Sequence, residues 1–243
     1  MLKFFAALLF VCSGLVQAQD ALQTDLPLSY LAQASIDSQD KPLIVFMHGY
    51  GSNEKDLFGI KDLLSADYNY LSVRAPVQLR PGSFQWFTQK PQSPDYDGVT
   101  VDLKSSGERL ALFIKAAAEK YHTQPGKVFL VGFSQGAIMS YEIALRHPGS
   151  VGGIAALSGR VLPVLRADLK AQGKPDSQLK NLAVFIGHGT ADPRLPFSGA
   201  KDAEAYVKSL GITPEFHGYS GVGHTISEAE VDDLKAWLEK VAR

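Results

Sequence analysis

KVFLVGFSQGAIMSYEIALRHP, residues 127–148, sets one serine between two glycines where an apolar run meets a helical pattern that Pro148 ends. The first part suits a buried strand and the second an amphipathic helix. A strand that turns at once into a helix forces the residue at the tip into a strained conformation with positive φ, and side chains two positions away would collide. Gly132 and Gly136 carry no such side chains. We therefore expect Ser134 to present its hydroxyl alone at the tip of a sharp turn.

Similar apolar runs recur along the chain and alternate with longer helical patterns. The runs occupy 43–47, 70–75, 127–133, 151–159, 181–189 and 214–219, and the helical patterns occupy 103–122, 134–147, 199–210 and 227–241. Most runs are too uniformly apolar for a strand with one wet face, so both faces of the sheet must be covered. Repeated strand and helix units predict an α/β fold with a mostly parallel central sheet and helices on both faces. No internal repeat or long linker divides residues 19–243, which predicts a single domain.

The composition restricts the class of protein. The chain has 243 residues, of which 45% are apolar and 20% charged, as in ordinary soluble globular domains and unlike disordered or fibrous chains. Its formal net charge of -1 provides no basic field that would gather phosphates, and no basic stretch is interleaved with aromatic residues. We therefore expect no nucleic-acid partner.

The first residues differ from the rest of the chain. After MLK, residues 4–16 form an apolar stretch of signal-peptide length, and Val16 and Ala18 suit a signal peptidase. We expect residues 1–18 to be a cleaved signal peptide and the protein to be exported, either periplasmic or secreted. An uncleaved anchor would need about 18 to 20 apolar residues, so no stable membrane insertion is expected after cleavage. Cleavage also removes Cys12, the sole cysteine, and with it any disulfide or thiol nucleophile.

A serine hydroxyl is a weak nucleophile, so chemistry at Ser134 needs a base, and the base needs an orienting carboxylate. His224 follows SGVG in a glycine-rich loop before the last helix, where its ring can reach back over the sheet edge. Asp192 lies in GHGTADPRLP, at the carboxyl end of a predicted strand. Nucleophile, acid and base in this chain order are typical of α/β-hydrolases. We predict that Ser134, Asp192 and His224 are the catalytic residues.

The remaining histidines have structural interpretations. His122 and His147 end helical patterns, His188 sits in a turn between glycines, and His217 lies within a predicted strand. His48 comes too early in the chain for the base of this fold, and we interpret it as a buried ring that holds its loop. No pair of histidines has the helical spacing used for zinc, and neither a metal nor another cofactor is predicted.

Attack on a carbonyl group creates an oxyanion, which needs two preset N–H donors. The first candidate is the backbone N–H of Gln135, at the start of the helix after Ser134. The second is the backbone N–H of Tyr50, in the loop HGYGSNEKDL, whose glycines let the backbone bend toward the serine. We predict that Tyr50 and Gln135 form the oxyanion hole.

Several segments together resemble one protein family. They are MHGYGSNEKDL, VRAPVQLRPGSFQWF, GFSQGAIMS, LSGRVLP, GHGTADPRLP and GVGH, and they extend from the first predicted strand to the last helix. This combination is similar to the phospholipase/carboxylesterase family of α/β-hydrolases, which includes bacterial carboxylesterases and acyl-protein thioesterases. The resemblance implies a compact hydrolase without a large cap domain or cofactor, acting on esters or thioesters through Ser134, Asp192 and His224. It also implies that Trp86 and the segment around Leu162 line the acyl pocket.

Two features depart from that family. Ala137 stands where a second glycine is common, a small change that should tighten the packing at the turn. The predicted signal peptide is the other departure, because many members are cytosolic. Export argues against a role in deacylating cytosolic proteins.

The stretch 80–101 is the least regular in the chain and carries Phe84, Trp86, Phe87 and Tyr96 among prolines and glycines. These aromatic side chains could fill the core, or they could form an apolar rim for the acyl or alcohol part of a substrate. We favour the rim, because loops that border a site on this fold determine specificity. Trp86 and Phe87 are therefore predicted substrate-binding residues, together with Leu162, which the family resemblance implies.

The predicted function is hydrolysis of small to medium carboxylic esters through an acyl-enzyme, with a small-molecule ester as the partner. A serine peptidase would use the same three catalytic groups, although the sequence contains no sign of a peptide-binding module. A non-catalytic binding protein could retain the hydrolase scaffold. Acyl-chain length, thioester preference, lysophospholipid use and oligomeric state are left open by the sequence.

Overall fold

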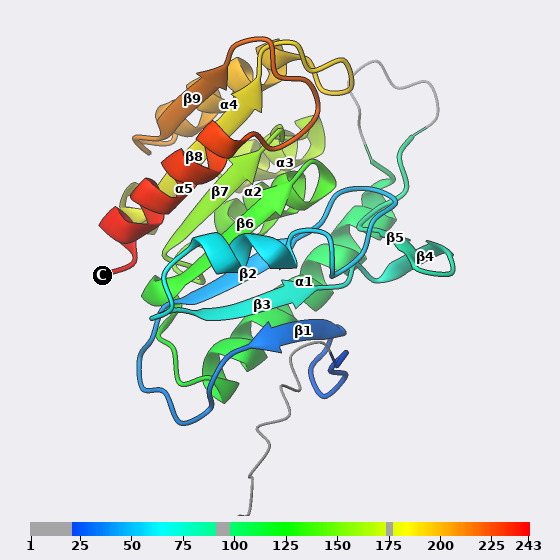
Figure 1. Ribbon diagram of the computed structural model, residues 1–243. Helices are drawn as coiled ribbons and strands as arrows, with labels where there is room; N and C mark the ends of the chain where they lie inside the picture. The colour runs from blue at the N-terminus through cyan, green and yellow to red at the C-terminus, as the bar shows by residue number, and fades with distance from the viewer. Residues whose placement is uncertain (1–20, 91–97, 174–176) are drawn as a thin grey trace, which may run out of the picture.

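A seven-stranded sheet forms the centre of the molecule (Figure 1). The computed structural model describes residues 21–90, 98–173 and 177–243. The spatial order is β1-β3-β2-β6-β7-β8-β9, with the bounds Tyr30–Gln33 (β1), Leu43–Met47 (β2), Asn69–Val73 (β3), Val128–Phe133 (β6), Gly153–Leu157 (β7), Ala183–Gly189 (β8) and Glu215–Tyr219 (β9). Each neighbouring pair is parallel except β1 and β3. A separate hairpin joins β4 (Val77–Arg80) to β5 (Ser83–Gln85).

Helices cover both faces of this sheet (Figure 1). One face carries α1 (Thr100–Lys120), α2 (Gln135–Arg146), α3 (Pro163–Gln172) and α4 (Phe197–Ser209), and the other carries α5 (Glu228–Val241) and the 3-10 helix η1 (Phe58–Leu63). Two further 3-10 turns, η2 (Pro125–Lys127) and η3 (Ser177–Asn181), precede β6 and β8. In the described part of the chain, no helix has both the length and the apolar character needed to cross a bilayer.

Alternation along the strands builds an apolar core on each face. In β2, Val45 belongs to the larger core under α1 to α4, whereas Ile44 and Phe46 belong to the core under α5 and η1. Successive side chains of a strand point to opposite faces, so a strand covered on both sides is apolar at every position. All residues of β2 and β7 are buried. The fold class predicted from uniformly apolar runs, a mostly parallel sheet with helices on both faces, is confirmed.

The sequence patterns do not predict β1, the β4–β5 hairpin or α3. β1 is an edge strand of 4 residues, too short to display an alternation. α3 has 10 residues, and its apolar side consists of the buried Leu165 with the half-buried Val164 and Leu169, a pattern too short to stand out in the sequence. By contrast, α1 continues through Gly107 without a break, because its apolar positions pack against the sheet and hold the weaker turn in place.

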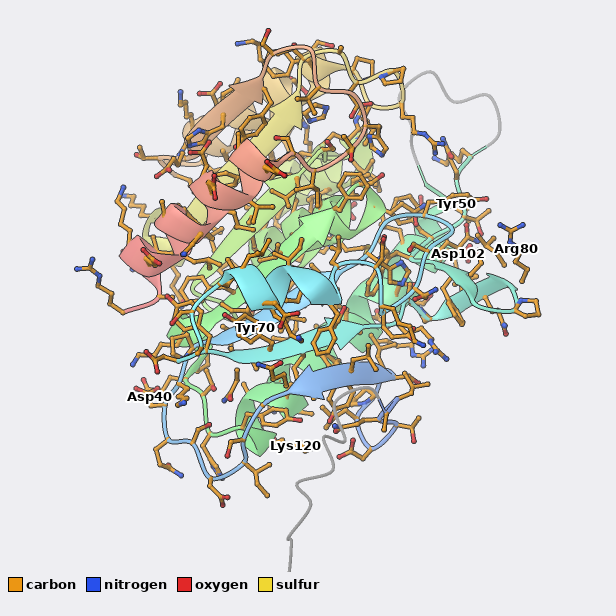
Figure 2. All side chains as sticks on the ribbon, in the orientation of Figure 1. Asp40, Tyr50, Tyr70, Arg80, Asp102 and Lys120 are labelled. Carbon is orange, nitrogen blue, oxygen red and sulfur yellow. The ribbon has the colours of Figure 1, made fainter. Side chains whose placement is uncertain are left out.

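The carboxyl ends of the parallel strands meet along one edge of the sheet. The segments after β2, β6, β8 and β9 carry, in that order, Tyr50, Ser134, Asp192 and His224. Parallel strands end at the same edge, so residues far apart in the sequence converge there. Figure 2 shows Tyr50 at this edge, whereas Asp40, which precedes β2, lies at the opposite one.

Candidate active site

The turn between β6 and α2 has the strained geometry expected from its glycines. Ser134 has φ 55° and ψ -116°, a conformation that residues with a Cβ rarely adopt. A Cβ added to Gly132 would lie 2.3 Å from the carbonyl oxygen of Gly136, and one added to Gly136 would lie 2.0 Å from that of Met47. A side chain at either position would therefore displace the turn from its place against α2 or β2.

Three side chains from separate loops meet at this turn. The Ser134 hydroxyl lies 3.0 Å from Nε2 of His224, and Nδ1 of His224 lies 2.6 Å from Oδ2 of Asp192. An ionised carboxylate only accepts hydrogen bonds, so Nδ1 carries the proton and Nε2 accepts from the serine hydroxyl. The ring of Phe133 packs against the imidazole, with 4.9 Å between ring centroids. The three side chains predicted from the sequence therefore form one continuous line of hydrogen bonds.

Asp192 is held at both carboxylate oxygens. Oδ1 accepts from the backbone N–H groups of Arg194 at 2.8 Å and Leu195 at 2.9 Å, which leaves Oδ2 for His224. Burial alone would raise the pKa of Asp192, but the hydrogen bonds from His224 and the two backbone N–H groups outweigh it and hold the pKa below its usual value. The carboxylate is therefore ionised and aligned on the imidazole at neutral pH.

His188, in β8, holds the segment that carries Asp192. Its buried ring donates from Nε2 to the carbonyl oxygen of Leu195 at 2.8 Å, and Nε2 lies 3.3 Å from Oδ2 of Asp192. Burial lowers the pKa of His188, which keeps the ring neutral. The sequence suggested only a turn residue here. One sequence feature could have indicated the role of His188 in supporting Asp192: the two residues are four positions apart at the end of an apolar run.

His48 has the structural role expected from the sequence. Its ring is fully buried, Nε2 accepts from the backbone N–H of Ala75 at 3.1 Å, and Nδ1 donates to the carbonyl oxygen of Gly49 at 2.7 Å. Burial lowers the pKa of His48 and favours this neutral form. The ring thus ties the segment after β2 to the segment after β3.

The two predicted oxyanion donors lie on the segments that flank Ser134. Gln135 is the first residue of α2, so its N–H has no partner within the helix. The N–H of Tyr50 belongs to the loop after β2, and within the described chain neither amide donates to another residue. A Cβ on Gly49 would lie 3.4 Å from Cβ of Ser134, which places this loop directly against the serine.

A cavity of about 510 Å³ opens beside Ser134. The described residues that line it are Gly49, Tyr50, Ser52, Asp56, Gln89, Phe133, Ser134, Arg194, Leu195 and His224. Most of these residues have polar or charged side chains, but about half of the lining surface is apolar, and Phe133 and Leu195 are its apolar residues. In the same described ranges, no group of three or more histidine, cysteine, aspartate or glutamate side chains is placed to hold a metal ion.

The structure differs from the prediction for the substrate-binding residues. Trp86, Phe87 and Leu162 each have 0% exposed surface and do not line the cavity beside Ser134. The Trp86 indole instead donates to the carbonyl oxygen of His48 at 2.8 Å, and the Phe87 ring fills the space that a Cβ on Gly98 would occupy. These side chains belong to the core, because an apolar side chain has a lower free energy in a packed interior than in water. Tyr96, also predicted at the rim, lies outside the described residues.

Ala137 fits as the sequence suggested. A Cβ added to Gly159, at the start of the segment after β7, would lie 2.5 Å from Cβ of Ala137. The methyl group of Ala137 therefore occupies the space that the missing side chain of Gly159 leaves. Ala137 therefore adds a contact between α2 and the segment after β7 that a glycine at position 137 would lack.

Comparison with known proteins finds relatives that cover most of the chain. The family described as Phospholipase/Carboxylesterase matches residues 30–242. The chain is 29% identical to the carboxylesterase SOBER1 of Arabidopsis thaliana, over 82% of this chain and 90% of that protein. It is 28% identical to acyl-protein thioesterase 1 of Debaryomyces hansenii, over 84% of this chain and 92% of that protein. The crystal structure of esterase PE8 matches with a TM-score of 0.74 and 26% identity, covering 86% of this chain and 97% of that chain.

Proposed function

The chain belongs to the phospholipase/carboxylesterase family of α/β-hydrolases, and from that membership we propose that Ser134, Asp192 and His224 are the catalytic triad of a serine ester hydrolase. The observation that carries the proposal is the unbroken set of hydrogen bonds from the Ser134 hydroxyl through His224 to Asp192. Relatives named carboxylesterase and acyl-protein thioesterase support oxygen esters and thioesters as the substrate class.

The proposed reaction transfers an acyl group to water in two halves. Ser134 attacks the carbonyl carbon while Nε2 of His224 takes the hydroxyl proton, and the ionised Asp192 stabilises the imidazolium that forms. His224 then gives this proton to the departing alcohol or thiol as the acyl-enzyme is formed. A water molecule, deprotonated by the same histidine, attacks the acyl-enzyme, and the proton returns to Ser134 as the acid leaves.

The oxyanion of each tetrahedral intermediate is proposed to accept from the N–H groups of Tyr50 and Gln135. Both amides flank Ser134, and neither is used by another described residue. A preset donor of this kind contributes about 3 to 4 kcal/mol to transition-state stabilisation. The positive end of the α2 dipole adds to the attraction.

The cavity favours a compact substrate. Its lining is about half polar and half apolar, and it includes the charged residues Asp56 and Arg194. The volume of about 510 Å³ limits the length of the acyl chain, and the charged groups lower the gain from burying a long one. We propose short to medium acyl esters, without metal or organic cofactor, as the substrates.

Replacement of the nucleophile tests this function. Ser134→Ala should abolish hydrolysis of a short p-nitrophenyl ester while the variant keeps the unfolding temperature of the parent within a few degrees, because only a hydroxyl is lost. A fluorophosphonate probe should label the parent at Ser134 and leave the variant unlabelled. Full turnover by the alanine variant would refute the assignment of the nucleophile.

Two rival functions give different results in simple assays. A serine peptidase on this fold would cleave an anilide as well as the matched ester, whereas an esterase would cleave the ester and leave the anilide intact, so a comparison of the two substrates with the same acyl group separates the activities. A non-catalytic binding protein would fail to react with the fluorophosphonate. The three hydrogen-bonded side chains favour the esterase, because a binding protein has no use for an aligned base and carboxylate.

We further propose that residues 19–243 act as one exported domain, periplasmic or secreted, after removal of a signal peptide at 1–18. The apolar stretch 4–16 and the small residue Ala18 support this proposal. Residues 1–18 lie outside the described residues.

A further inference from the structure

We propose that the side chains of Trp86 and Gln135 are positioning groups that fix the two oxyanion donors relative to each other. The inference rests on the proposed function and extends it to two side chains that lie beneath the site. Both residues are buried, and neither side chain lines the cavity beside Ser134. Their effect on the reaction must therefore pass through the backbone that they hold.

The Gln135 side chain is clamped to the segment after β5. Its Oε1 accepts from the backbone N–H of Trp86 at 3.0 Å, and its Nε2 donates to the carbonyl oxygen of Phe87 at 3.0 Å. These two bonds fix the rotamer of the residue whose own N–H is the first oxyanion donor. A buried amide with both ends bonded would leave unpaired polar groups if it moved, so this clamp resists displacement.

The Trp86 side chain carries the connection to the second donor. Its Nε1 donates to the carbonyl oxygen of His48 at 2.8 Å, two residues before Tyr50. Its own carbonyl oxygen accepts from the hydroxyl of Ser106 in α1. The N–H, the carbonyl and the indole of Trp86 are thus all bonded, and the residue connects the loop after β2, through its indole, to the start of α2, through its backbone N–H.

The same His48 carbonyl also meets the turn that carries the nucleophile. A Cβ added to Gly136 would lie 2.9 Å from this oxygen, so α2 packs directly on the peptide that Trp86 holds. The loop after β2 needs such a restraint, because Gly49 and Gly51 flank Tyr50 and Gly51 has φ of +78°. A continuous path therefore runs from the Gln135 amide through Trp86 to His48, and it sets the spacing of the two N–H donors.

Loss of this restraint should slow chemistry more than binding. Oxyanion donors act on the charge that develops in the transition state, so a displaced donor lowers kcat and leaves KM almost unchanged. Trp86→Phe keeps an aromatic ring but removes the indole N–H. We expect kcat to fall by roughly 10-fold to 100-fold, because a displaced donor should cost no more than the roughly 100-fold or larger effect of removing a donor entirely.

The chain offers a matched control for this substitution. Trp237, the other tryptophan, is 3% exposed in α5 and packs against Phe129 and Phe185 on the opposite face of the sheet. Trp237→Phe removes the same atoms from a buried site that does not contact the turn. Its cost in thermal stability should resemble that of Trp86→Phe, while its kcat should equal that of the parent.

The experiment compares parent, Trp86→Phe, Gln135→Met and Trp237→Phe. The measurements are kcat and KM on one p-nitrophenyl ester, the inhibition constant of a trifluoromethyl ketone, and that of the unreactive alcohol of the same length. The ketone adds to the serine hydroxyl and forms an oxyanion, whereas the alcohol reports ground-state binding alone. In Trp86→Phe and Gln135→Met we expect the affinity for the ketone to fall in parallel with kcat. The affinity for the alcohol should equal that of the parent.

The inference is overturned if a folded Trp86→Phe or Gln135→Met variant retains the parent kcat and ketone affinity. It is also overturned if Trp237→Phe loses kcat to the same extent, because the effect would then reflect general destabilisation. If Trp86→Phe fails to fold, Gln135→Met decides, since it interrupts the same path at its other end. Full activity of Ser134→Ala would instead refute the proposed function. Failure of the proposed function is therefore distinguishable from failure of this inference.

Discussion

At the scale of single residues, the missing side chains of Gly132 and Gly136 allow Ser134, the proposed nucleophile, to occupy the tip of its turn. Ser134 adopts a positive φ only because the chain on either side packs tightly against β2 and α2. Strained conformations persist where the surrounding structure determines them. Gly136 is the tighter of the two flanking glycines, since it faces the backbone of Met47 and His48.

Gly136→Ala is therefore expected to destabilise the protein by about 2 kcal/mol or more and to lower kcat, because the new methyl group meets backbone that cannot yield. Chemical denaturation and ester hydrolysis measure the two effects. Gly107→Ala, within α1, is the matched control, because its methyl group would meet only Cε of Met139, at 3.9 Å. That control should be neutral or stabilising by up to about 1 kcal/mol. Equal effects of the two substitutions would contradict this account of the turn.

Asp192→Asn is expected to lower kcat by roughly 100-fold to 10,000-fold with little change in KM. An amide nitrogen in place of Oδ2 cannot accept from Nδ1 of His224, and the imidazolium loses its counter-charge. Steady-state kinetics on a p-nitrophenyl ester check this result. Unfolding temperature serves as the control, because Oδ1 can still accept from Arg194 and Leu195. A variant with the parent kcat would remove Asp192 from the mechanism.

At the scale of elements, α5 carries a buried acid close to the strand that supports Asp192. Glu230 lies in the first turn of α5 with 0% exposure, and a Cβ on Gly187 of β8 would lie 2.3 Å from its Oε1. Burial raises the pKa of Glu230 to about 8, and the nearby Asp233 adds to the effect. The native protein therefore retains a proton on this group at neutral pH that the unfolded chain has lost.

This proton makes stability depend on pH. The pKa of Glu230 is higher in the native protein than in the unfolded chain, so protonation of this group stabilises the fold fully at acid pH. The stabilisation is lost as pH rises from the ordinary glutamate range through about 8. Glu230→Gln keeps the shape without the ionisation. We expect the variant to match the parent near about pH 5 and to exceed its free energy of unfolding near about pH 9. Denaturation curves at both values measure this, and an identical pH dependence in both proteins would contradict the prediction.

At the scale of the whole molecule, the parallel sheet assembles a site from four loops that are far apart in the sequence. The segments after β6, β8 and β9 carry the proposed nucleophile, acid and base, and the segment after β2 carries the proposed second oxyanion donor. Two layers of helices bury the sheet, so its core is large enough to hold these loops without a disulfide.

The proposed export predicts the covalent form of the mature chain. Cleavage after Ala18 would leave residues 19–243 without Cys12, the only cysteine. We expect protein recovered from the exported fraction to have the mass of residues 19–243, to react with no thiol reagent, and to unfold at the same temperature with and without reductant. Mass spectrometry and a thiol assay check this. An intact leader on protein from that fraction would contradict the cleavage.

Much of the architecture is fixed locally and could be read from the chain alone. Runs that are apolar at every position, such as 43–47, require cover on both faces, and glycines two positions from Ser134 require a sharp turn. Chain order then singles out Asp192 and His224 among many aspartates and histidines. These signals survive in a single sequence because each depends on period or spacing along the chain.

The roles of Trp86, Phe87, Leu162 and His188 were decided only by the tertiary structure. An aromatic side chain in an irregular stretch has the same sequence signature whether it borders a cavity or fills the core, and here the packing of β5, α1 and α2 buries it. The sequence by itself determined most of the strands and helices, although not β1, the β4–β5 hairpin or α3, and it singled out the candidate reactive groups. Which buried groups hold those reactive groups in place depends on neighbours that the crossover connections bring together, and no periodicity along the chain encodes that proximity.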